Sequence, residues 1–133
     1  MKKINTLCVI DDDDIYTFTI KRIIAKAEVA EKTIFFHNGQ VAIDFFHNCL
    51  ELISNLPDMI LLDLNMPVLD GWQFLDEFIK LVPRLGKKIL IYIVSSSIDE
   101  DDFKRAKAME QVSDFIVKPL NAGDLRNIVD QWA

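Results

Sequence analysis

The sequence is poor in the features that mark membrane proteins, nucleic-acid-binding proteins and disulfide-bonded proteins. No window approaches the roughly 20 apolar residues of a membrane span. The formal net charge is −6, and no segment gathers the Lys and Arg side chains that neutralise a nucleic-acid backbone. Cys8 and Cys49 lack the repeated spacing of a zinc site or a disulfide framework. We therefore expect a cytoplasmic protein with no membrane contact, no direct nucleic-acid binding and reduced, buried cysteines.

Linkers, internal repeats and low-complexity stretches are also missing. The chain has 133 residues, half of them apolar, which is enough to bury one core. We predict one domain over residues 1–133. No effector region follows Trp132, so the chain is either a single-domain protein or a piece of a longer one. The short lead-in before the first apolar run favours the single-domain interpretation.

Short apolar runs rich in β-branched residues alternate along the chain with segments of helical periodicity. The predicted strands cover residues 7–10, 33–36, 59–62, 89–94 and 115–117. Apolar residues with helical spacing follow each run, over residues 16–27, 41–50, 74–82, 103–109 and 125–132. Runs that are apolar throughout are typical of parallel strands covered by helices on both faces. The pattern predicts an α/β fold, doubly wound, with the alternation (βα)₅.

Residues that cap helices stand before several of the predicted helices. Asn38 and Asp70, each followed by Gly, are expected to open the second and third helices. The segment from Ser97 to Glu100 has the pattern of a capping box for the fourth helix, with Ser97 as its cap. Asp14 is the expected cap of the first helix, because Asp is favoured at that position.

Polar side chains stand at the carboxyl ends of four of the predicted strands. The first strand ends in Asp11 and Asp12, the third in Asp63, the fourth in Ser95, and the fifth in Lys118, followed by Pro119. Ligands of open parallel sheets bind outside the carboxyl ends of the strands, so these side chains are expected to share one crevice.

Carboxylates packed closely repel one another, and a cation relieves that repulsion. Magnesium suits such a site, because it prefers hard oxygen ligands and keeps waters that a phosphate can replace. One carboxylate can then attack a phosphoryl group and become an aspartyl phosphate. Four consecutive aspartates leave two candidates for the metal pair, Asp11 with Asp12 or Asp12 with Asp13, and the first pair directly follows Ile10.

These motifs resemble the receiver domains of two-component response regulators, and the resemblance covers essentially the whole chain. The matching residues are the acidic pair after the first strand, the serine, the lysine–proline pair, and the segment after the third strand: Asp63-Leu64-Asn65-Met66-Pro67 with Asp70-Gly71. The resemblance implies a flavodoxin-like fold with a five-stranded parallel sheet in the order 2-1-3-4-5 and helices on both faces. It also implies a phosphoacceptor in a two-component or phosphorelay pathway.

The resemblance further assigns roles in the metal site. Asp63 would be the phosphoacceptor and would also contact the metal, Asp12 would bind the metal directly, and Asp11 would bind it through water. The backbone carbonyl of Asn65 would be another ligand. Mg²⁺ is the expected cofactor, and Mn²⁺ is an expected substitute.

The same resemblance implies a switch. Lys118 would contact the phosphoryl group, Pro119 would follow a cis peptide bond, and Ser95 would move toward the phosphate. Phe115 would turn inward at the same time. The face formed by the fourth helix, the fifth strand and the fifth helix would then change its affinity for a protein effector.

The expected phosphodonor is a histidine kinase or a phosphotransfer protein, and the expected assembly is a monomer or a phosphorylation-dependent dimer. Two rival functions fit these residues less well. A docking module that works without phosphorylation has no need of mutually repelling carboxylates. A phosphatase of the haloacid dehalogenase type has a second acid two residues after its nucleophile, where this chain has Asn65. We therefore expect no enzyme activity beyond slow self-catalysed phosphotransfer and autodephosphorylation.

Overall fold

A parallel five-stranded sheet forms the centre of the molecule. The computed structural model describes residues 3–66 and 68–132. The sheet has the order β2-β1-β3-β4-β5, as the resemblance implied. Its strands are β1 (Ile4–Ile10), β2 (Ala30–Phe36), β3 (Met59–Leu62), β4 (Leu90–Ser95) and β5 (Val112–Val117).

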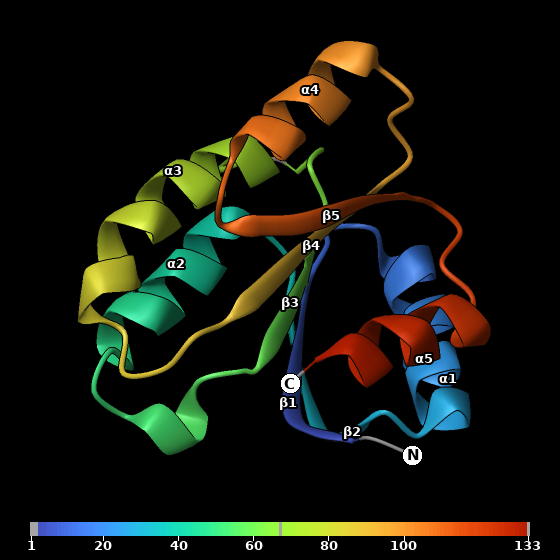
Figure 1. Cartoon of the computed structure of the whole chain (residues 1–133), viewed down its shortest axis with the longest axis horizontal. Helices are drawn as coiled ribbons and strands as arrows, with labels where there is room; N and C mark the ends of the chain where they lie inside the picture. Colours follow the sequence, from blue (N-terminus) through green and yellow to red (C-terminus); the bar gives the residue numbers. More distant parts are fainter. Residues whose placement is uncertain (1–2, 67, 133) are drawn as a thin grey trace.

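Helices cover both faces of this sheet, so the predicted doubly wound architecture is confirmed (Figure 1). They are α1 (Asp14–Ala27), α2 (Gly39–Asn48), α3 (Gly71–Leu81), α4 (Glu100–Ala108) and α5 (Ala122–Gln131). The short 3₁₀ helices η1 (Ile53–Asn55) and η2 (Val82–Arg84) follow α2 and α3. Within residues 3–66 and 68–132, every helix falls short of the length and apolar character needed to cross a membrane.

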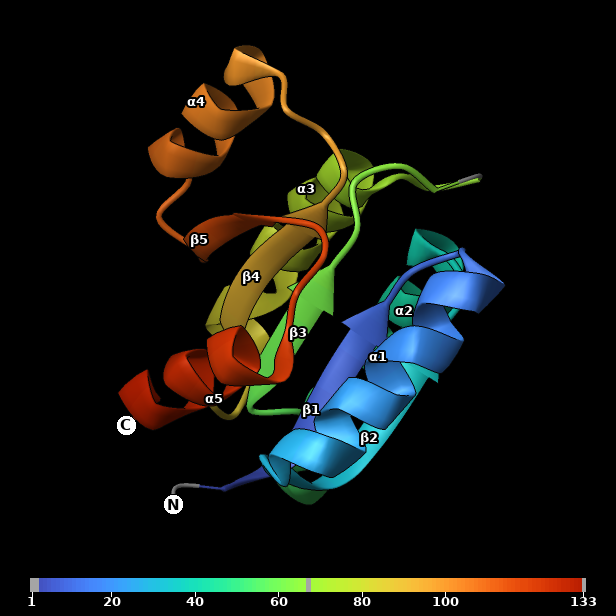
Figure 2. The same ribbon diagram turned by 90° about the vertical axis from the view of Figure 1, so that its right-hand side faces the viewer.

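The helices fall into two layers because the strands bury side chains on both faces. Figure 2 shows α1 and α5 on one side of the sheet and α2 and α3 on the other. The α2 and α3 side combines aliphatic residues with stacked and edge-on aromatic rings, of which Phe46 and Phe78 are centred 5.1 Å apart. The α1 and α5 side is filled by aliphatic residues such as Ile20 and Val129. Cys8 and Cys49 are free and buried, as expected.

The strands at the two edges of the sheet begin earlier than the sequence predicts. β3 matches its predicted range, whereas β2 begins at Ala30 and β5 at Val112; the central strand β1 also begins early, at Ile4. The added residues include exposed polar positions, because each edge strand pairs with one neighbour only. An apolar run marks only the buried part of such a strand.

Two of the predicted helix caps are confirmed and two are wrong. Asn38 and Asp70 cap α2 and α3. The cap of α1 is Asp13, not Asp14, because the Asp13 carboxylate accepts hydrogen bonds from two backbone N–H groups of the first turn. The cap of α4 is Asp99, not Ser97, and the Ser97 hydroxyl instead accepts the backbone N–H of Asp99.

Candidate functional site

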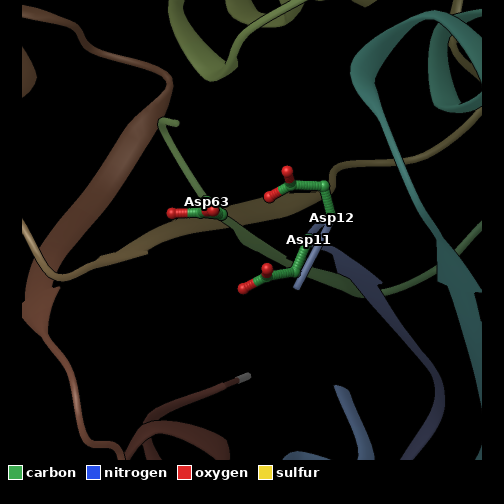
Figure 3. Close-up of side chains that lie close together, drawn as sticks. All are labelled: Asp11, Asp12 and Asp63. Carbon is green, nitrogen blue, oxygen red and sulfur yellow. The ribbon is translucent and has the colours of Figure 1, made fainter. Parts of the chain in front are cut away.

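Three aspartates converge where β1 and β3 end at the carboxyl edge of the sheet. Ile10 pairs with Leu62, and this register sets the next residue of each strand, Asp11 and Asp63, side by side. One carboxylate oxygen from each of Asp11, Asp12 and Asp63 lies within 4.8 Å of the other two. Figure 3 shows the three side chains lying close together. Asp11 and Asp63 are buried and Asp12 is exposed, so the group opens to solvent on one side.

Lys118, which follows the edge strand β5, adds a positive charge to this group of carboxylates. Its backbone N–H donates to the Ser95 carbonyl at 2.8 Å, which fixes the chain just after β5. Its ammonium Nζ lies 2.8 Å from Asp11 Oδ2 and 3.8 Å from Asp63 Oδ1. Three carboxylates and one ammonium leave two negative charges without a partner. That excess equals the charge of one divalent cation.

Burial and repulsion by a neighbouring charge disfavour the ionised form of the Asp63 carboxylate. Burial, followed by the charge of Asp11, raises the pKa of Asp63 to about 6. The Lys118 ammonium and a hydrogen bond from the Asn65 backbone offset part of this increase. The pKa therefore places Asp63 where protons and a cation compete for it near neutral pH.

The four consecutive aspartates form two pairs with different structural positions. Asp11 Oδ1 accepts the backbone N–H of Asp13 at 2.9 Å, which turns the chain after β1. The Asp13 carboxylate caps α1, while Asp14 is the first residue of that helix. Asp11 and Asp12 are therefore the pair that faces Asp63, and the other open register, Asp12 with Asp13, is not the one in this structure.

The loop after β3 is held close to the start of α3. Gly71 donates its backbone N–H to the Leu64 carbonyl at 2.9 Å. A Cβ at Gly71 would lie 2.5 Å from the Asp63 carbonyl oxygen, so a larger residue would push the loop and Asp63 out of place. Asn65 is exposed in this loop. Pro67 of the same motif lies outside the described residues.

The remaining predicted site residues lie on β4 and β5. Ser95 ends β4 and is fully buried, and its Oγ accepts the backbone N–H of Ser97 at 3.2 Å. The Lys118–Pro119 peptide bond is cis, the isomer expected from the sequence. Phe115 is already buried in this structure, with its ring centroid 4.3 Å from that of Phe103 on α4. An inward rotation of Phe115 would therefore have to start from a different state.

Several residues near the site carry contacts that sequence reasoning missed. Tyr16 packs against the core, as the helical spacing of residues 16–27 predicts, and its ring also lies against the Lys118 ammonium. Asp102 accepts hydrogen bonds from the Ser97 hydroxyl at 2.6 Å and from the Trp72 indole at 3.3 Å, so it joins the β4–α4 loop to α3. The one sequence signal for Tyr16 was its position just after the acidic run.

The donor set fits a hard divalent cation. Carboxylate oxygens are the ligands that Mg²⁺ and Mn²⁺ prefer, and the uncompensated negative charge of the site is opposite in sign and equal in size to the charge of such an ion. Asp11, Asp12 and Asp63 would hold the ion.

The whole fold and this acidic edge correspond to one known family. Residues 7–130 match the response regulator receiver domain. The chain belongs to this family. As a receiver domain, it is a part of two-component signalling, which the sequence had indicated.

Solved structures of receiver domains resemble this one over nearly the full chain. A two-component response regulator from Cytophaga hutchinsonii is 32% identical with a TM-score of 0.87, and the match covers 97% of this chain and 96% of that one. The Mn²⁺-bound form of response regulator Rcp1 is 28% identical, with a TM-score of 0.74 and coverages of 94% and 88%. The phosphorylated cyanobacterial phytochrome response regulator RcpA is 31% identical, with the same TM-score and coverages.

Curated relatives differ in how much of their length this receiver domain spans. It covers 79% of the Probable methanogenesis regulatory protein FilR2 of Methanothrix harundinacea, at 27% identity. It covers 28% of a protein-glutamate methylesterase/protein-glutamine glutaminase of Treponema pallidum, at 34% identity. The same receiver unit thus forms most of one protein and a minor part of another.

Proposed function

We propose that this receiver domain takes a phosphoryl group on Asp63, with Mg²⁺ or Mn²⁺ held by Asp11, Asp12, Asp63 and the backbone carbonyl of Asn65. The observation that carries the proposal is the group of three carboxylates within 4.8 Å, with Lys118 Nζ at 2.8 Å from one and 3.8 Å from another. The Mn²⁺-bound Rcp1 and the phosphorylated RcpA support the metal and the modification by similarity.

Of the two buried carboxylates, Asp63 is the better phosphoacceptor, because its oxygens are held by weaker contacts than those of Asp11. Both oxygens of Asp11 are occupied, one by the Asp13 backbone N–H and the other by Lys118 at 2.8 Å. Asp12 is exposed. Asp63 is buried and accepts a hydrogen bond from the Asn65 backbone, but its Oδ1 lies 3.8 Å from Lys118 Nζ, farther than the 2.8 Å between Lys118 and Asp11. A nucleophile needs a free lone pair at the reacting position, which Asp63 retains.

In the proposed reaction, a carboxylate oxygen of Asp63 attacks the phosphorus of the donor. The bond between phosphorus and the donor atom breaks, and the leaving group departs with its electron pair. That group is an imidazole from a histidine kinase or phosphotransfer protein, or acetate from acetyl phosphate. The bound cation would neutralise charge on the phosphoryl oxygens. Lys118 would give one of those oxygens an ammonium partner, and the Ser95 hydroxyl would donate a hydrogen bond to another.

The phosphate is expected to leave slowly. A phosphatase needs an acid to activate water or a leaving group, and two residues after Asp63 this chain has an amide, Asn65. Self-catalysed transfer and slow autodephosphorylation are therefore the proposed limits of its chemistry.

The proposed output is a change in the surface formed by α4, β5 and α5. Ser95 ends β4, and the Ser97 N–H that it accepts belongs to the loop that leads into α4. A phosphoryl group that draws on the Ser95 hydroxyl would bias this loop, and with it the affinity for a protein effector, by a population shift. Ser95 and Phe115 are the proposed switch residues, in a monomer or a phosphorylation-dependent dimer.

The test is the mass of the intact protein after incubation with acetyl phosphate, with and without Mg²⁺. Wild type should gain a single phosphate that is lost on treatment with acid or hydroxylamine, and only when Mg²⁺ is present. Asp63→Asn should gain none, with an unchanged circular dichroism spectrum as the control for folding. Stoichiometric labelling of Asp63→Asn would mean that another residue is the acceptor.

No label on wild type, under conditions that fully label a control receiver domain, would sink the proposal. The chain would then be better explained as a docking module that acts without phosphorylation.

A further inference from the structure

Tyr16 lies shortly after the four consecutive aspartates and is positioned by one of them, Asp13. Asp13 Oδ1 accepts the backbone N–H of Tyr16 at 3.2 Å and so fixes the first turn of α1. Because side chains of a helix lean toward its amino end, this turn directs the Tyr16 ring back toward the end of β1, where Asp11 lies. The position of the ring therefore depends on Asp13, which directly follows the proposed metal pair Asp11 and Asp12.

The ring of Tyr16 forms one wall around the Lys118 ammonium. Lys118 Nζ lies 4.0 Å from the ring centroid, within the range of a cation–π contact. The lysine side chain is 16% exposed, so water screens this contact little. Asp11 and Asp63 lie within 4 Å of the same Nζ atom. The ammonium is thus held by two carboxylates and an aromatic face.

The phenol of Tyr16 is buried and neutral. Its hydroxyl oxygen has no hydrogen-bond partner among residues 3–66 and 68–132. Burial, with the charges of Asp11 and Asp63, raises the pKa of the phenol well above its ordinary value. A buried hydroxyl without a partner lowers stability, so hydrogen bonding does not explain a tyrosine here. The ring packs against the core on the α1 and α5 side, and the charged group that it contacts is Lys118.

We propose that Tyr16 is a positioning residue for Lys118, and that its ring keeps the ammonium on the Asp63 side of the pocket. The inference rests on the proposed function for its consequence, since Lys118 matters there as the partner of the phosphoryl group. Lys118 is nearer to Asp11 than to Asp63. A cation that takes Asp11 as a ligand weakens that ion pair, and the ring contact remains. The ammonium then stays beside Asp63 when the phosphoryl group arrives.

The experiment compares the rate of labelling by acetyl phosphate in Mg²⁺ for three variants. Tyr16→Leu removes the ring and should slow labelling about tenfold, the size of a cation–π contact screened from water. Tyr16→Phe keeps the ring and should label within about twofold of wild type. Phe18→Leu is the matched control, because Phe18 lies on the same helix with 62% of its surface exposed, and its labelling rate should not change.

A double-mutant cycle separates positioning of Lys118 from a general structural effect. In a Lys118→Ala background, Tyr16→Leu should cause no further slowing, because the cation that the ring holds is gone. Equal slowing in both backgrounds would overturn the inference, and so would wild-type labelling by Tyr16→Leu. In either case a wild type that labels leaves the proposed function standing.

A measurement on the metal-free, unphosphorylated protein tests the contact itself. The ring should shift the NMR signals of the Lys118 ε-methylene protons upfield in wild type and in Tyr16→Phe, and the shift should vanish in Tyr16→Leu. Signals that do not respond to loss of the ring would overturn the inference. This NMR measurement tests the contact between Tyr16 and Lys118 even if wild type takes no phosphate label and the proposed function fails.

Discussion

Two buried aspartates flank the same short strand, and they have opposite surroundings. Asp58 precedes β3 and Asp63 follows it; they are 4% and 6% exposed, and each contacts a lysine. Asp58 Oδ1 lies 2.7 Å from Lys87 Nζ, and its Oδ2 accepts the backbone N–H groups of Asn5 and Thr6. Asp63 shares one lysine, Lys118, with Asp11, and Asp12 adds a third carboxylate beside them.

The difference separates a structural carboxylate from the proposed phosphoacceptor. At the amino edge of the sheet, each oxygen of Asp58 has its own donor, and Lys87 also donates to the Leu56 carbonyl. At the carboxyl edge, charge is left uncompensated, and the pKa of Asp63 rises to about 6. Burial is therefore common to both aspartates. Uncompensated charge is the feature that singles out Asp63, the proposed phosphoacceptor.

Removing the structural carboxylate should give the largest loss of stability. Asp58→Ala removes the carboxylate partner of Lys87 and the acceptor of two backbone N–H groups, so we expect a loss of about 3 kcal/mol in the free energy of unfolding. Urea denaturation measures it. At a temperature where the variant remains folded, acetyl phosphate should still label it. A stable Asp58→Ala that cannot be labelled would reverse the roles given to the two aspartates.

Acid should weaken metal binding through Asp63. A cation needs the ionised carboxylate, and the pKa of Asp63 is raised to about 6. Mg²⁺ affinity should be flat above pH 7 and fall about tenfold per pH unit well below pH 6. Titration calorimetry at pH 5 and pH 7.5 checks this. Asp63→Asn should bind more weakly but lose the pH dependence in this interval, and an unchanged pH profile in that variant would contradict the assignment.

The smallest expected effect is a gain in stability when repulsion is relieved. The folded-state pKa of Asp63 lies above its unfolded value, so the metal-free protein should lose stability as pH rises from about 4 to about 6. Asp63→Asn should therefore be more stable than wild type at pH 7, by about 1 kcal/mol after allowance for solvent screening. Melting curves in the presence of a chelator measure it. Excess Mg²⁺ should reduce the difference in stability between Asp63→Asn and wild type. If Asp63→Asn were less stable than metal-free wild type, the result would argue against repulsion between the carboxylates of the site.

The parts of the fold that sequence could predict are those set by local pattern. The buried run of β3 matched to the residue, because all four of its side chains are apolar and buried. The early halves of β2 and β5 were missed, because their exposed polar residues carry no strand pattern. The caps at Asp13 and Asp99 were each assigned to a neighbour, because adjacent Asp and Ser residues are all good caps and only the backbone geometry chooses among them.

The predicted site residues could be gathered from sequence because parallel strands align their carboxyl ends. That rule brings Asp11 and Asp63 together and also brings Lys118 into reach. It does not reveal contacts from a helix, such as the ring of Tyr16 over Lys118. Nor does it reveal the compensation of Asp58 by Lys87, since the two residues are far apart in the chain and nothing local links them.

Among the five α-helices of residues 3–66 and 68–132, α4 buries the fewest residues. Among its described residues one, Ala106, is buried, whereas α3 buries five. Its other ties include the hydrogen bonds of Asp102 with Ser97 and Trp72, which a small movement can exchange for water. Elements with little buried surface open and close locally while the rest of a domain stays folded. Amide hydrogens of α4 should therefore exchange with solvent long before those of the central strands, and a partner could reshape this helix without disturbing the sheet.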